Sequence, residues 1–374
     1  MPDKKEIGYR PTWAEVDLNN LADNFRKVGA GLAPKTKILV TVKADAYGHG
    51  LIPVSKKLAG LGVDFLGVAS IDEGIKLRQA GINIPVLILG VVLNRDISPI
   101  AKFGLTPTVC DEASAAAFSR LAKKAGRLFN LHVKVDTGMG RIGVQHKDAF
   151  KLLQKINRFP FIRIEGIFTH FPLADINKRF TCAQIRVFDQ LVEDLKKSGI
   201  TIPLVHAANS VGLADYKDSH FTMVRPGLVI YGLYPKEDLG IKLKPVLSLK
   251  SRVIFVKDVP KGFGVSYAHA YVTRQPGRIV TLPIGYGDGY PRNLSNKAPV
   301  LIGGRRFRIS GRICMDQIMV DVGSYKVRVG EEAVLIGRQN KAEITTEELA
   351  QLSGTIPYEI SCGLGSRIPR VYRP

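Results

Sequence analysis

Eight short apolar runs in the first two thirds of the sequence most strongly limit what this chain can fold into. Most are continuous stretches of Val, Ile and Leu rather than alternating ones, as expected for parallel strands covered on both faces. Amphipathic segments separate them. The runs are 37–43, 65–70, 85–90, 105–110, 131–136, 163–170, 204–209 and 223–232. Strand and helix alternating over about 230 residues predict an α/β fold, an N-terminal (β/α)8 TIM-type barrel.

The amphipathic segment 181–199 shows the helical pattern most clearly. Apolar side chains such as Ile185 and Phe188 recur at helical spacing. Thr181 is predicted as the N-cap of this helix, and Gly199 as its end.

The pattern changes near Pro245. Strand-like runs separated by Gly and Pro then predict a C-terminal, mainly antiparallel β domain. One helix in this part is predicted to begin at Thr345, with Glu348 completing a capping-box pattern. We therefore expect two domains, a barrel over 1–245 and a β domain over 246–374.

Composition limits the class of protein. Hydrophobic residues make up 45% of the 374 residues and charged residues 23%, which excludes a disordered chain. No apolar run reaches the ~18 residues of a spanning helix, and the first residues lack the apolar stretch of a secretion signal. The four cysteines show neither a metal-binding spacing nor a disulfide framework. We expect a cytoplasmic protein without a metal site or a membrane partner.

The net charge of +21 raises the question of a nucleic-acid partner. The excess is shared between the two parts, with +9 over 246–374 and +12 over 1–245, and no basic run exceeds two residues. This distribution favours a solvated basic surface over a nucleic-acid face.

Chemically distinctive residues stand where the predicted strands end, which is where TIM barrels carry their working groups. Lys43 ends the first run, and burial there would favour its neutral, nucleophilic form. A lysine at a strand end can also extend its ammonium to solvent. After the fifth run, Lys134 and Asp136 share one strand face and Arg141 follows in the loop. These charges need partners or an anionic ligand.

The last three strand ends add histidines and another arginine. His170 ends the sixth run and His206 the seventh, while Arg225 interrupts the eighth, where an unpaired charge is costly. The loops after strands seven and eight usually hold phosphate. Groups suited to that task are Asn209, Ser210 and the backbone of Gly227 and Leu228. A lone histidine is more often a core residue, but the joint occurrence at several strand ends favours an active site.

These segments resemble the sequence landmarks of alanine racemases, pyridoxal phosphate (PLP) enzymes with a barrel and a C-terminal β domain. The landmarks keep their order from about residue 9 to residue 373 and are VKADAYGHG, HVKVDTGMGRIG, HAANS, RPGLVIYG, VSYAHAY, IGYGDGY, GRICMDQ and SCGLGSRIPRVY. The resemblance implies PLP-dependent interconversion of L-alanine and D-alanine, supplying D-alanine for peptidoglycan. It also implies a homodimer with shared active sites.

The resemblance assigns roles to individual residues. Lys43 matches the base that also binds PLP as a Schiff base, and Tyr267 matches the second base, delivered from the other subunit. His170 matches the neighbour of that tyrosine. Arg225 matches the group at the pyridine nitrogen, and His206 the residue that orients it. The matched phosphate-holding positions are Tyr47, Ser210, Gly227, Leu228 and Tyr358.

Further matches concern the substrate. Arg141 matches the group beside the phenolic oxygen of PLP, and Lys134 a lysine that is carbamylated in many relatives. Met315 matches the backbone contact to the substrate carboxylate. The substrate corridor is matched by Tyr286, Tyr271, Arg292 and Asp175.

Three positions depart from the usual pattern and bear on substrate range. Pro172 and Leu173 stand where relatives commonly have a small residue, and Ala268 where glycine is frequent. A racemase for serine, lysine or several amino acids is therefore the main alternative. A non-catalytic PLP-binding protein would not need the second domain with Tyr267, and the features of the related decarboxylases are missing.

Overall fold

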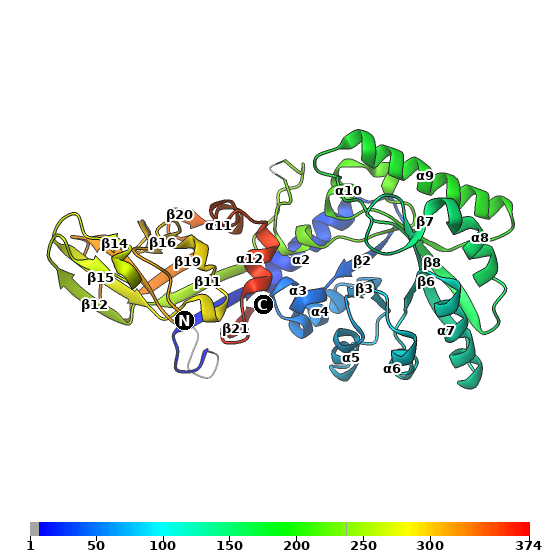
Figure 1. Ribbon diagram of the computed structural model, residues 1–374, viewed down its shortest axis with the longest axis horizontal. Helices are drawn as coiled ribbons and strands as arrows, with labels where there is room; N and C mark the ends of the chain where they lie inside the picture. The colour runs from blue at the N-terminus through cyan, green and yellow to red at the C-terminus, as the bar shows by residue number, and fades with distance from the viewer. Residues whose placement is uncertain (1–6, 237) are drawn as a thin grey trace.

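The computed structural model describes residues 7–236 and 238–374 and has two lobes, a barrel and a β-rich lobe (Figure 1). Each of the eight predicted runs overlaps a strand of the barrel. The strands are β2 (Lys37–Thr41), β3 (Phe65–Val68), β4 (Val86–Ile88), β5 (Thr108–Val109), β6 (Phe129–Asp136), β8 (Ile162–Phe168), β9 (Leu204–His206) and β10 (Met223–Val224). All neighbouring pairs within each sheet are parallel. The predicted TIM-type barrel is confirmed.

Two four-strand arcs close the barrel. One has the order β10-β2-β3-β4 and the other β5-β6-β8-β9. Backbone hydrogen bonds join the arcs at both seams, from Ile88 N to Thr106 O at 2.9 Å and from Arg225 N to Ala208 O at 2.9 Å. All eight strand ends therefore meet at one mouth.

Helices cover the outside of the barrel (Figure 1). They are α2 (Leu18–Ala30), α4 (Leu51–Gly60), α5 (Ile71–Gln79), α6 (Ser98–Lys102), α7 (Glu112–Lys124), α8 (His146–Ile156), α9 (Lys178–Lys197) and α10 (Ser210–Asp215). The N-cap predicted for α9 is wrong. Asn177 caps the helix by accepting from Phe180 N, while Thr181 lies buried inside the first turn and donates to Asn177 O. Gly199 lies just past the end of the helix at φ 85°, as predicted.

The C-terminal lobe is mainly antiparallel, as predicted. Its longest sheet path runs β17-β16-β19-β11-β1-β21, and a second sheet runs β12-β15-β18. The strands are β11 (Leu247–Arg252), β12 (Phe255–Val259), β13 (Gly264–Val265), β14 (Tyr271–Val272), β15 (Gly277–Leu282), β16 (Pro299–Ile302), β17 (Arg305–Arg308), β18 (Ile318–Gly323), β19 (Glu332–Gln339), β20 (Ala342–Ile344) and β21 (Arg370–Arg373). Helices α11 (Thr346–Ser353) and α12 (Pro357–Gly363) accompany them, and Thr345 caps α11 by accepting from Glu348 N.

Strand β1 (Thr12–Asp17) belongs to the sheet of the C-terminal lobe. It pairs antiparallel with β11 and parallel with β21. The domain limits 1–245 and 246–374 remain predictions. Strand β1 belongs by sequence to the first of these ranges, but both of its partner strands belong to the second. Residues 1–6 and 237, also in the first range, lie outside the described residues. A six-residue strand carries no sign of which sheet it joins, so the sequence could not assign it.

Neither a membrane-spanning helix nor a metal-binding group occurs among the described residues. No helix there is long and apolar enough to cross a bilayer. No cluster of three or more His, Cys, Asp or Glu side chains could hold a metal ion.

Candidate active site

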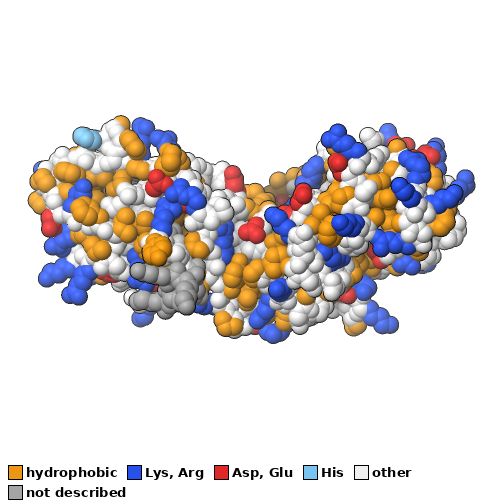
Figure 2. All heavy atoms as spheres, turned by 90° about the horizontal axis from the view of Figure 1, so that it is seen from below, with side chains coloured by type: hydrophobic (Ala, Val, Ile, Leu, Met, Phe, Trp, Pro, Cys, Tyr) orange, Lys and Arg blue, Asp and Glu red, His pale blue; other side chains and the backbone are white. Residues whose placement is uncertain are grey.

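A cavity of about 440 Å³ lies at the carboxyl ends of the barrel strands. The molecule is hollowed between its two lobes when seen from below the view of Figure 1 (Figure 2). Eleven of the predicted site residues line the cavity, namely Lys43, Tyr47, Lys134, Arg141, His170, Asn209, Ser210, Arg225, Gly227, Leu228 and Tyr358. Asp175 and Pro172 also line it.

A left-handed turn follows Lys43. The four residues 44–47 all have φ between 53° and 54°, although none is glycine. Such a turn costs roughly 1–2 kcal/mol per residue, so it needs external support. The Glu73 carboxylate supplies part of it, accepting from Ala44 N and Ala69 N at 2.7 Å each. This turn sends both Lys43 and Tyr47 into the cavity.

The environment of Lys43 favours its neutral amine. Burial lowers the pKa of Lys43, and the positive charge of Arg141 lowers it further, while Glu73 opposes both effects. A neutral amine is the form that attacks a carbonyl carbon or accepts a proton. Lys43 is therefore chemically suited to the role predicted from the sequence, that of a nucleophilic amine.

Arg225 is buried where it lines the cavity, and several neighbouring groups hold its guanidinium. Its guanidinium donates to Thr169 O at 2.6 Å and Ala207 O at 3.0 Å, and to His206 Nδ1 at 3.0 Å. His170 Nδ1 lies 3.4 Å away. Burial lowers the pKa of Arg225 to about 9, which still leaves a cation at neutral pH. Arg225 can only donate hydrogen bonds in this setting.

A chain of two imidazoles continues from Arg225 into the barrel core. His206 Nε2 lies 2.9 Å from His132 Nδ1, and His132 Nε2 lies 3.5 Å from Glu165 Oε2. Burial lowers the pKa of both rings, which favours their neutral forms. Because Arg225 donates to His206 Nδ1, each ring carries its proton on Nε2, and the His132 proton faces Glu165. The tautomers are thus fixed from the cavity inward.

Sequence reasoning missed His132 and Glu165, the inner members of this series of side chains. His132 stands two residues before Lys134 in β6, so period two already puts both on the face that carries Lys134 into the cavity. Gly166 makes room for the ring, since a Cβ there would come within 2.5 Å of His132. Glu165 itself gave no signal in the sequence.

Lys134 is 3% exposed and lies among cations. Its Nζ is 4.5 Å from the centre of the Phe168 ring. Burial lowers the pKa of Lys134 well below its usual value, and the charges of Arg225 and Arg141 act in the same direction. The charge of the nearby Asp136 opposes these effects but is among the smaller ones. The oxygens of that carboxylate accept from three backbone N–H groups at 2.8 Å. The cavity thus holds an excess of positive groups.

Hydroxyl and backbone groups line the side of the cavity reached by β9 and β10. Gly227 N donates to Ser210 Oγ at 3.1 Å. A Cβ on Gly227 would lie 2.9 Å from Tyr47 Oη, so glycine allows this close approach. Burial raises the pKa of Tyr47 and of Tyr358, which keeps both phenols protonated as donors. Asn209 caps α10 by accepting from Gly212 N.

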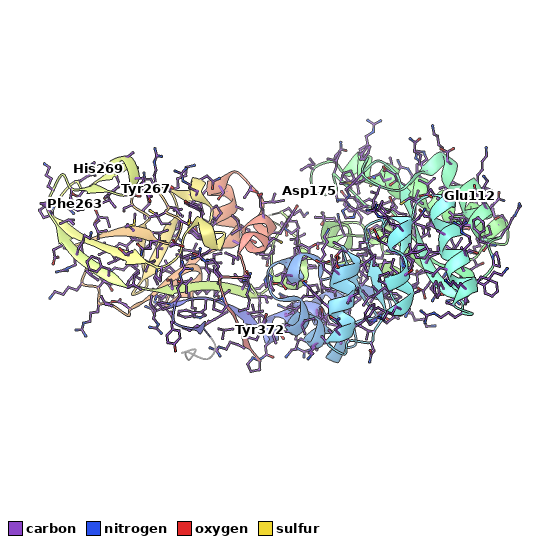
Figure 3. The ribbon with its side chains drawn as sticks, turned by 60° about the horizontal axis from the view of Figure 1, so that its bottom comes forward. Glu112, Asp175, Phe263, Tyr267, His269 and Tyr372 are labelled. Atoms are coloured by element: carbon purple, nitrogen blue, oxygen red, sulfur yellow. The ribbon has the colours of Figure 1, made fainter. Side chains whose placement is uncertain are left out.

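The structure does not bring Tyr267 or Met315 to the cavity of the same chain. Tyr267 opens the short helix η4 (Tyr267–His269), is 68% exposed and lies far from Asp175 at the barrel mouth (Figure 3). Met315 is also exposed and, like Tyr271, Tyr286 and Arg292, does not line the cavity. Ala268 has φ 58°, a conformation that glycine adopts more easily.

Comparison with known proteins agrees in both lobes. Residues 16–235 match the family model "Alanine racemase, N-terminal domain" and residues 246–372 match "Alanine racemase, C-terminal domain". The chain is 48% identical over 368 residues to an alanine racemase of Halothermothrix orenii, covering 97% of each.

Solved structures give the same result. An alanine racemase of Clostridium difficile 630 superposes with a TM-score of 0.92 at 39% identity, covering 97% of this chain and 96% of that one. The alanine racemase of Bartonella henselae, described with covalently bound pyridoxal phosphate, gives a TM-score of 0.88 at 30% identity, covering 97% and 99%.

Proposed function

Because the chain belongs to the alanine racemase family and is therefore an amino-acid racemase, we propose that it interconverts L-alanine and D-alanine with PLP. The observation that carries the proposal is the cavity in which Lys43, with its lowered pKa, faces the same space as Arg225. The product D-alanine would serve peptidoglycan synthesis in the cytoplasm.

The residues around the cavity fit a phosphorylated, anionic cofactor. Four basic side chains line it, namely Lys43, Lys134, Arg141 and Arg225. Tyr47, Ser210, Tyr358 and the backbone of Gly227 and Leu228 would hold the phosphate, with Asn209 at the same loop. Lys43 would hold the aldehyde carbon. When bound, PLP supplies a conjugated ring that takes up the electron pair left at the α-carbon.

Arg225 would direct the outcome toward racemisation. As a donor that stays charged, it would leave the pyridine nitrogen without a proton, which weakens electron withdrawal. His206 supports this role by holding the guanidinium at 3.0 Å. A proton would then return quickly to the α-carbon, and transamination would be slow.

Inversion needs one group that removes the α-proton and a second group, on the opposite face of the α-carbon, that returns a proton. Lys43 would serve one face and Tyr267 the other. Because Tyr267 is exposed and distant from its own cavity, we infer that it acts in the cavity of a second copy (Figure 3). A two-fold homodimer would form two equivalent shared sites. Met315 and Arg141 would contact the substrate carboxylate, and His170 would lie beside the partner's Tyr267.

The first test identifies the lysine that holds the cofactor. After PLP binding and borohydride reduction, mass spectrometry should find the cofactor fixed to the peptide that contains Lys43. The reason is the position of Lys43, which lines the cavity at the start of the turn that also brings in Tyr47, together with its lowered pKa. A fixed label on Lys134 instead would contradict the assignment.

A broader racemase, or one for serine or lysine, remains the second candidate because Pro172 lines the cavity. A panel of L-amino acids, with racemisation of each followed by chiral chromatography, separates the two. Alanine should give the highest kcat/KM. A higher value for serine or lysine would favour the alternative.

A further inference from the structure

A buried carboxylate, Asp288, forms the centre of an ion-pair cluster in the C-terminal lobe. Its side chain is fully buried. Arg10 binds both of its oxygens, with Nη2 2.7 Å from Oδ2. Gly285 N donates to Oδ2 at 2.8 Å, and Arg367 Nε lies 3.4 Å from Oδ1. A carboxylate removed from water needs partners of this kind. The cluster therefore holds the backbone around Asp288 in one conformation.

The same two arginines also bind the neighbouring loop at Asp316. Arg10 Nη2 donates to Asp316 O at 3.0 Å. Arg367 Nη2 donates to Asp316 Oδ1 at 2.6 Å. The cluster therefore joins the loop around Asp288 to the loop that ends at Asp316.

Backbone contacts continue this joint to Tyr286 and Met315. Tyr286 N donates to Cys314 O at 3.0 Å, and Gly287 N donates to Met315 O at 2.9 Å. Gly285 allows the approach, since a Cβ there would lie 2.2 Å from Cys314 O. The side chains of Tyr286 and Met315 nonetheless remain 42% and 53% exposed. The backbone of both residues is therefore held by hydrogen bonds, while their side chains face solvent.

We propose that Arg10, Asp288 and Arg367 are positioning residues that hold Tyr286 and Met315 for the active site of the partner subunit. This inference rests on the proposed function and its shared sites. Two exposed loops would otherwise lose conformational freedom each time substrate binds, which weakens binding. The cluster removes that freedom in advance. None of its three members touches the substrate.

Arg10→Met tests the proposal, because Arg10 is 29% exposed and Asp288 keeps Arg367 and Gly285 N as partners in this variant. We expect the KM for alanine to rise about tenfold while kcat changes less than about twofold. Arg10→Lys should recover part of the loss. Arg306→Met is the matched control, since it removes an Arg–Glu348 pair of the same lobe away from these loops. An unchanged KM in Arg10→Met would overturn the proposal.

Stability and positioning are separated by the double variant Arg10→Met/Asp288→Asn. Removing both charges avoids an unpaired buried carboxylate, so thermal stability should exceed that of Arg10→Met alone. The raised KM should remain. A KM that returns to the wild-type value together with stability would assign the cluster a purely structural role.

Mixed dimers show in which subunit the cluster acts. Arg10→Met is mixed with Lys43→Ala under conditions that exchange subunits, so that one site of each mixed dimer has an intact Lys43 and intact partner loops. A component with the wild-type KM should appear. Lys43→Ala mixed with Tyr267→Phe runs in parallel. The Lys43→Ala and Tyr267→Phe mixture could regain activity while the Arg10→Met mixture shows only the raised KM. That result would contradict the positioning role of the cluster and leave the shared site supported.

Discussion

At the scale of single residues, burial decides the chemistry of the cavity more than pairing does. The cationic form of Lys43 is disfavoured first by burial and then by Arg141. Arg225 keeps its charge but uses its hydrogen bonds on His206 and two backbone carbonyls. The sequence predicted these residues because each stands at a strand end. It could not predict the His132–Glu165 extension, because that depends on which side chains face each other across the barrel.

Arg225→Glu should change the type of reaction as well as its rate. A carboxylate at this position would stabilise the protonated form of the pyridine nitrogen by accepting its hydrogen bond. The loss of the hydrogen bonds that Arg225 donates should slow racemisation about a hundredfold. Transamination should rise, with new absorbance at long wavelength. Arg225→Lys, which keeps the charge, is the control. If Arg225→Glu keeps its rate and spectrum, Arg225 does not face the ring.

Lys134 should react with carbon dioxide. Its pKa is lowered by burial and by Arg225 and Arg141, which increases the fraction of neutral amine, the form that carbon dioxide adds to. The resulting anion could pair with Arg141. Labelled bicarbonate should give a carbamate carbon signal by NMR that fades as pH falls and is missing in Lys134→Arg. Absence of the signal, with no bound anion in its place, would contradict this.

At the scale of elements, strand–helix alternation was enough to predict the barrel, because each strand is buried on both faces and each helix on one. Two features escaped that logic. Strand β1 pairs with strands far along the chain, and no local pattern reports its partner. The left-handed turn at 44–47 contains no glycine to mark it. It depends on a contact with Glu73 from α5, which only the fold brings near.

Glu73→Gln should loosen this turn. The amide keeps one acceptor but turns a donor toward the other backbone N–H, costing about 1–2 kcal/mol of unfolding free energy. Denaturant unfolding would measure the loss. Asp72→Asn is the matched control, since it removes the same charge from the first turn of α5 without a bond to 44–47. Equal losses in the two variants would mean that Glu73 acts only through the helix terminus.

At the scale of the whole molecule, the residues proposed for the active site lie at two ends of an elongated chain. The cavity lies at the mouth of the barrel, whereas Tyr267 and Met315 are exposed on the other lobe. Figure 3 shows Tyr267 far from Asp175 at the barrel mouth. The sequence suggested this division only through resemblance. Spacing alone could not say whether the second lobe folds back over its own barrel.

Mixing two inactive variants tests the division directly. Lys43→Ala and Tyr267→Phe in a mixed dimer leave one site with both lesions and one with neither. At equal mixing, half of the dimers have one intact site of two, so activity should return to about a quarter of wild type. Native mass spectrometry confirms the exchange. Confirmed exchange without activity would mean that both groups work within one chain.

The position of β1 has a consequence for the order in which the protein matures during synthesis. Residues 12–17 are synthesised long before their partners, 247–252 and 370–373. The barrel strands lie between 37 and 224 and pair with one another, so the barrel can close before the partners of β1 are synthesised. The long sheet of the C-terminal lobe is completed only when the last residues appear. A chain that lacks 370–373 would leave one edge of β1 without its parallel partner strand, in the same lobe that carries Tyr267.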